Sequence, residues 1–144
     1  MAIKYKEGDI FAIQTRDGRY AICQVVCAFK GDFRKAVSFG VLCVSDTKEI
    51  PADSDFLDFD DYRGSFKIIF ASSTNIKRGD WEVLGHIPLS TEKQAFRIYQ
   101  CAGHLYRGDE YVKHLDIAEY RDYITLSVAG NELVQNYLDQ LGSA

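Results

Sequence analysis

The chain has 144 residues and a formal net charge of −4, and 47% of its residues are hydrophobic and 13% aromatic. That length suits one domain with a real core, and so much apolar and aromatic content excludes a disordered chain. No apolar run approaches the roughly 20 residues of a membrane helix, and the N-terminus lacks the apolar region of a signal peptide. We expect a single domain over residues 1–144 that is cytoplasmic and does not associate with a membrane.

The clearest local signal is a hairpin between Asp9 and Val26, in which two apolar runs flank Asp17-Gly18. An Asp-Gly pair supplies the positive φ angles of a two-residue type I′ turn. That turn places Ile13 opposite Ile22, and it leaves both faces of the hairpin apolar. We therefore expect the hairpin to lie inside a sheet that is covered on both sides. Like charges on the two residues that flank the turn leave a slightly longer loop as the alternative.

The rest of the chain is typical of short strands followed by one helix. The helix is predicted over residues 131–141, with Asn131 as N-cap, an apolar stripe that includes Val134 and Leu138, and Gly142 after its end. Strands are expected at residues 36–45, 65–72, 81–89, 94–101, 110–115 and 124–128, with a loop at 102–108 and a helical turn at 116–122. About seven or eight strands with this spacing favour a mainly β fold. We expect a strongly bent antiparallel sheet or a small SH3-like barrel over residues 5–128, with one C-terminal amphipathic helix.

The negative charge is concentrated in one segment. Between Asp46 and Tyr62 there are seven acidic residues and one lysine, a charge of −6, which leaves +2 for the rest of the chain. The segment shows no strand period, and its aromatic residues at three-residue spacing permit at most a helical turn. It is either a solvated loop pinned to the body by its aromatics or a partner-binding surface. The candidate binding residues are four aspartates and three aromatics: Asp55, Phe56, Asp58, Phe59, Asp60, Asp61 and Tyr62.

The residue types that usually carry chemistry form no catalytic or metal-binding pattern. The four cysteines lie in apolar surroundings without a Cys-x-x-Cys pair, so we expect buried, reduced thiols. The three histidines lack metal-ligand spacing. We expect His86 at the core or a strand edge, satisfied by a backbone carbonyl, and Trp81 as a core anchor. There is neither a phosphate-binding glycine pattern nor a basic surface for nucleic acid, and we predict no cofactor, no metal and no nucleic-acid partner.

Several blocks of the sequence resemble one known family. They lie, in order, at residues 8–13, 17–20, 68–70, 76–81 and 84–89. The most distinctive are Gly79-x-Trp81 and, a few residues later, Gly85-His86-x-Pro88. Together they are similar to immunity protein 26, a family of bacterial immunity proteins attached to polymorphic toxin systems. The resemblance runs from about residue 6 to residue 99 and brings no catalytic residue with it. It implies that the protein neutralises a cognate toxin by tight binding.

These observations favour binding over catalysis. The first interpretation is a non-enzymatic immunity protein whose aspartates compete with phosphates for the basic cleft of a toxin that cuts nucleic acid. Phe56, Phe59 and Tyr62, if partly exposed, would supply anchors that become buried in the complex. The alternatives are an SH3-like module for a peptide or small ligand and a small enzyme. An enzyme would need a pocket of converging histidine, cysteine or carboxylate groups. The sequence leaves the oligomeric state open.

Overall fold

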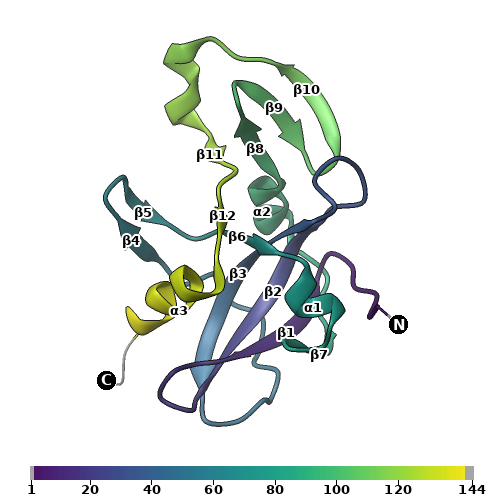
Figure 1. The fold of residues 1–144 in the computed structure, drawn as a ribbon, viewed down its shortest axis with the longest axis vertical. Helices are drawn as coiled ribbons and strands as arrows, with labels where there is room; N and C mark the ends of the chain where they lie inside the picture. Colours follow the sequence, from purple (N-terminus) through teal and green to yellow (C-terminus); the bar gives the residue numbers. More distant parts are fainter. Residues whose placement is uncertain (1, 142–144) are drawn as a thin grey trace.

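The computed structural model describes residues 2–141, and within them twelve strands form three sheets (Figure 1). The six-stranded sheet contains, in spatial order, β12 (Val128–Ala129), β6 (Ile69–Ser72), β3 (Ala36–Ser45), β2 (Tyr20–Ala28), β1 (Asp9–Gln14) and β7 (Glu82–His86). The four-stranded sheet contains β10 (Glu110–His114), β9 (His104–Arg107), β8 (Ile98–Cys101) and β11 (Ile124–Thr125). The third sheet is the hairpin of β4 (Phe59–Asp61) and β5 (Gly64–Phe66).

Short helical segments connect these strands. They are α1 (Thr74–Lys77), α2 (Thr91–Gln94), the 3-10 helices η1 (Ala95–Arg97) and η2 (Ile117–Asp122), and the C-terminal α3 (Asn131–Asp139). None of the helices within residues 2–141 combines the length and the apolar character that crossing a membrane requires.

The mainly β fold with bent sheets and one C-terminal helix is confirmed, but the sheets do not close into a barrel. Most neighbouring strands are antiparallel. Two pairs are parallel, β12 with β6 and β11 with β8, and each lies at the edge of a larger sheet. Both β11 and β12 belong to one stretch of chain that passes from the four-stranded to the six-stranded sheet. Each reaches its partner after a long connection, which is what parallel pairing requires.

The β1–β2 hairpin is present with the longer loop that was the alternative, so the register predicted for a two-residue turn is wrong by one residue. Ile13 pairs with Ala21, not with Ile22. The loop is one residue longer because the backbone N–H of Thr15 donates to the Arg19 carbonyl (2.8 Å), with Gly18 at φ +84°. A one-residue shift moves every side chain of the second strand to the opposite face of the sheet.

The six-stranded sheet is covered on both faces, as expected for the hairpin at its centre. On one face, Phe11 stacks on Trp81 with ring centroids 5.7 Å apart, and Phe39 meets both rings edge-on. The buried α3 residues Val134 and Leu138 belong to this cluster. The second cluster joins the other face of the sheet to β8, and it contains Ile10, Ala12, Ile22, Val26, Cys27, Phe29, Phe70 and Tyr99. Trp81 is therefore the core anchor that its sequence position predicted.

Two predicted elements between residues 94 and 108 are wrong in part. The first half of the expected strand 94–101 is helical, because the Ser90 side chain accepts the Lys93 N–H and so caps α2. The expected loop 102–108 contains β9. Ala102 and Gly103 both have positive φ, which makes the tight two-residue turn that joins β8 to β9. Alanine rarely adopts a positive φ, so the Ala-Gly sequence at this position did not indicate a turn.

The other predicted elements differ less from the observed ones. The expected strand 65–72 divides into β5 and β6, and the strand 124–128 divides into β11 and β12. The predicted C-terminal helix is present as α3, but its N-cap is Gly130. Asn131 does not cap because its side-chain amide exchanges two hydrogen bonds with the amide of Asn75. Gly142 lies outside the described residues.

Candidate partner-binding surface

The acidic segment (residues 46–62) is irregular up to residue 58 and then enters β4. Its buried attachment to β3 of the six-stranded sheet is made by Phe56. The Phe56 ring packs directly on Gly40 of β3, where an added Cβ atom would lie 2.3 Å from the ring. The backbone N–H of Leu57 donates to the Val41 carbonyl at 2.8 Å. Gly40 is therefore needed at this position so that Phe56 can lie against the strand.

A buried lysine attaches the segment at a second point. Lys93 of α2 is almost fully buried, and its Nζ lies 2.5 Å from an oxygen of Asp53 and 2.8 Å from Oε1 of Gln24. The same Nζ lies 4.5 Å from the centre of the Phe56 ring. A buried ammonium is tolerated only where its charge and its N–H groups have partners. Asp53 therefore neutralises Lys93, and it connects the segment to the body.

The β4–β5 hairpin is attached by α3. The Gln140 side chain accepts the backbone N–H of Asp60 and donates to the Asp60 carbonyl, both at 2.8 Å. Phe59 is fully buried in the cluster shared with α3, next to Phe66 and Tyr137. Asp61 accepts the N–H of Arg63 and lies 3.5 Å from its guanidinium. The burial of Tyr137, and secondarily the charge of Asp61, raises the pKa of the Tyr137 hydroxyl.

The predicted binding residues divide into two groups. Phe56 and Phe59 are buried, so in this structure they hold the segment in place and do not contribute to its surface. The Asp61 side chain is 15% exposed and lies in its pair with Arg63. The outward-facing residues are Tyr62, which is 92% exposed, and three aspartates that we call the exposed acids: Asp55, Asp58 and Asp60.

The exposed acids differ in their partners. Asp58 lies 2.8 Å from Lys67, a weak surface pair. Asp60 accepts a hydrogen bond from the Ser65 hydroxyl at 2.6 Å. Within residues 2–141, neither Asp55 nor Asp60 has a cationic group in ion-pair distance. Two carboxylates are thus left for an external cation, on a backbone that Gly40, Lys93 and Gln140 hold in place.

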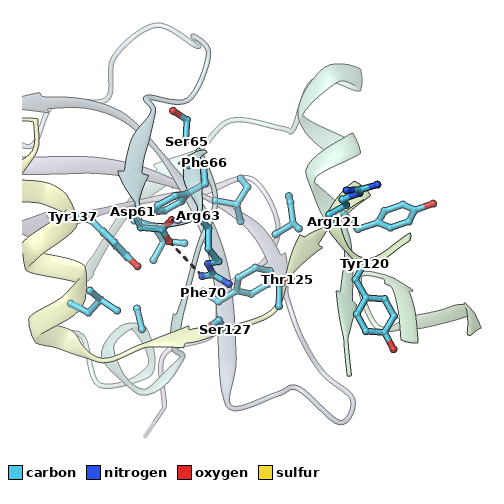
Figure 2. A pocket seen from close by; sticks show the side chains of 17 residues that line it. Asp61, Arg63, Ser65, Phe66, Phe70, Tyr120, Arg121, Thr125, Ser127 and Tyr137 are labelled. Carbon is cyan, nitrogen blue, oxygen red and sulfur yellow. Dashed lines mark hydrogen bonds and ion pairs between the residues drawn. The ribbon is translucent and has the colours of Figure 1, made fainter. Parts of the chain in front are cut away.

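An open groove of about 550 Å³ lies beside the hairpin. Figure 2 shows Asp61, Arg63 and Phe66 of the hairpin region on one side, with Tyr120 and Arg121 of η2 on the other. Phe70 of β6 and several residues between 123 and 137 complete the lining. The two sides of the groove are about sixty residues apart and carry no shared motif, so no local pattern in the sequence indicates it. No histidine or cysteine lines it among the described residues.

The remaining reactive side chains lie elsewhere. His86 on β7 is paired through Nδ1 with the Asp9 carboxylate at 2.8 Å, and not with a backbone carbonyl as expected. All four cysteines are free thiols, and Cys43 and Cys101 are only partly buried. Burial raises the pKa of Cys27 to about 11 and that of Cys23 well above its ordinary value. Within residues 2–141, no three histidine, cysteine or acidic side chains are grouped so that they could hold a metal ion.

A model of the family Immunity protein 26 matches residues 6–104 of the chain. The chain belongs to the Immunity protein 26 family. Neither the curated proteins nor the solved structures contain a match. Membership of an immunity protein family supports an immunity role and a non-catalytic protein.

The matched range of this Immunity protein 26 member contains the β1–β2 hairpin, the acidic segment and β8. It also contains one side of the groove, including Arg63 and Phe66. The other side of the groove, from η2 to α3, comes from residues beyond the match.

Proposed function

We propose that this immunity protein binds a cognate protein toxin through the acidic segment and neutralises it without catalysis of its own. The observation that carries the proposal is the concentration of charge. Seven acidic residues against one lysine lie within 17 positions of a chain whose remainder is weakly basic. The exposed acids face outward from a segment that buried contacts attach to the body, which suits recognition of a preformed surface.

The carboxylates of the acidic segment indicate a toxin with a cationic active-site cleft. Enzymes that cut nucleic acid bind phosphates with lysine and arginine, and a fixed set of carboxylates competes for the same groups. Opposite charge on the two proteins also accelerates their encounter. The exposed ring of Tyr62, at the tip of the hairpin, is the aromatic side chain of this surface that a partner would bury. We place the interaction in the bacterial cytoplasm, where free thiols stay reduced.

The proposal is tested in two steps. Affinity capture with the tagged protein from its native host, followed by mass spectrometry, identifies bound chains that carry a candidate toxin domain. That domain is then expressed in a bacterium from an inducible promoter, with and without the immunity protein. We expect growth arrest without the immunity protein, normal growth with it, and a stoichiometric complex of the two purified proteins. A toxin of an unrelated family is the control, and its effect on growth should not change.

Growth arrest that persists while the folded immunity protein is abundant would contradict the proposal. Neutralisation at immunity-protein levels far below those of the toxin would also contradict it, because binding is stoichiometric and only catalysis turns over.

A further inference from the structure

Three sheet edges meet at the groove. The edge strands are β12 of the six-stranded sheet, β11 of the four-stranded sheet and β5 of the hairpin. Within residues 2–141, no strand pairs with the outer side of any of them. All three contribute to the groove, through Ser65 and Phe66, through Ile124 and Thr125, and through Ala129. An unpaired strand edge presents backbone N–H and C=O groups to an incoming strand.

The side chains of the groove determine the chemistry of a ligand that would fit it. Its surface is mostly apolar and aromatic, with Phe66, Phe70 and Tyr137 among the lining residues (Figure 2). It contains one carboxylate and two guanidinium groups, and Asp61 already pairs with Arg63. Arg121 is exposed, and its guanidinium has no hydrogen-bond or ion-pair partner among the described residues. A complementary ligand would therefore bring apolar side chains and a carboxylate.

We infer that the groove binds an extended segment of the toxin, with apolar side chains at alternate positions and a carboxylate that pairs with Arg121. The segment adds as a strand to one of the three edges, so that alternate side chains enter the groove and the others face away. This inference rests on the proposed function, and it adds a second contact of different chemistry. The exposed acids meet a cationic surface, whereas the groove takes an apolar segment with an acidic residue.

The other exposed edge of the four-stranded sheet is less suited to this role. All five residues of β10 are exposed, and the pairing with β9 shifts register between Tyr111 and Lys113. Such an irregularity hinders the addition of a further strand. In addition, β10 contributes no residue to the groove.

The test uses the purified toxin domain that the immunity protein neutralises. Hydrogen exchange of the immunity protein, free and in the stoichiometric complex, reports the backbone amides of residues 64–66 and 124–129. We expect slower exchange at one or more of these edges in the complex. Unchanged exchange at all of them would overturn the inference.

Two pairs of variants test the side-chain chemistry. Arg121→Glu should weaken the complex at least tenfold, whereas Arg107→Glu, the same charge change on exposed β9 outside the groove, should alter affinity less than twofold. Ser127→Trp should fill the groove and weaken the complex at least tenfold, whereas Ser127→Ala should not. Circular dichroism and thermal unfolding confirm that each variant is folded. Equal affinities within either pair would overturn the inference.

The outcomes separate the two proposals. If the toxin is neutralised and only reversal of the exposed acids weakens binding, the groove inference fails and the proposed function stands. If the purified immunity protein binds no toxin, both fail.

Discussion

The six-stranded sheet and the acidic segment are held by different kinds of contact. Aromatic and aliphatic side chains bury both faces of the sheet. Many such contacts together stabilise it. The acidic segment is attached at a few identifiable points, which include Phe56 on Gly40, Phe59 in the cluster with α3, Asp53 on Lys93, and Gln140 on the backbone of Asp60. The stability of the sheet and the presentation of the exposed acids therefore depend largely on different contacts. Single substitutions away from the points where the two regions meet should therefore affect one region without the other.

Trp81→Ala should have the largest effect, and it should act on the sheet. Removal of a buried indole that contacts Phe11 and Phe39 leaves a cavity and should lower the free energy of unfolding by about 3 to 5 kcal/mol. Urea unfolding followed by circular dichroism measures it. Tyr62→Ala, an equally drastic truncation on the acidic segment, should change stability by less than about 0.5 kcal/mol. Similar losses in both variants would show that the two regions are not distinct.

A buried thiol in the sheet should also lower the free energy of unfolding at alkaline pH. Burial raises the pKa of Cys27 on β2 to about 11, so the folded state keeps a proton that the unfolded chain releases from about pH 9. The stability from this group is fully present below pH 9 and is lost as pH rises towards 11. By pH 10.5 the loss should be about 2 kcal/mol.

Cys27→Ala serves as the control for this pH dependence. Urea unfolding at pH 8 and pH 10.5 should show that the wild type loses about 2 kcal/mol more than the variant over this range. Equal losses would mean that the buried thiol does not carry the effect.

Gly40→Ala should loosen the attachment between the two regions. The new methyl group would meet the Phe56 ring and displace it, at a cost of about 1 to 3 kcal/mol. Gly130→Ala is a matched control, because its Cβ would enter open space and its φ is −68°. Hydrogen exchange of residues 46–58 should accelerate in the first variant alone. Unchanged exchange there would indicate that Phe56 does not anchor the segment.

Among the variants that remove an attachment of the acidic segment, Gln140→Ala should have the smallest effect on stability and the most local one. It removes two exposed hydrogen bonds to Asp60, worth about 1 kcal/mol together. Gln135 lies on the same helix and donates to Gln14 of β1, so Gln135→Ala is the comparison. Faster amide exchange over residues 59–66 is expected in Gln140→Ala only. The same acceleration in Gln135→Ala would assign it to a general weakening of α3.

Local signals in the sequence identified much of the sheet and little of the groove. Asp17-Gly18 correctly indicated a hairpin, but its register depends on Thr15, whose hydroxyl accepts the Arg19 N–H and hydrogen-bonds to Asp17. That network lengthens the loop by one residue, and an Asp-Gly pair alone does not reveal it. The apolar period of α3 was readable because it is local.

The candidate surface was predictable only as a concentration of charge. Composition alone located the exposed acids, but it did not separate them from Phe56 and Phe59, which are buried. That separation depends on contacts with Gly40 of β3 and with Tyr137 of α3, which are distant in sequence. The groove depends even more on tertiary structure, since it joins the edges of three sheets.

The most direct test of the central claim is the dissociation constant of the purified toxin complex for two double variants. Asp55→Lys/Asp60→Lys reverses two exposed acids without a cationic partner, and Asp32→Lys/Glu110→Lys makes the same charge change on exposed residues elsewhere. We expect the first to weaken binding by roughly thirtyfold or more and to reduce its salt dependence, and the second to change affinity by less than about threefold. Equal effects of the two double variants, or no effect of the first, would contradict the account.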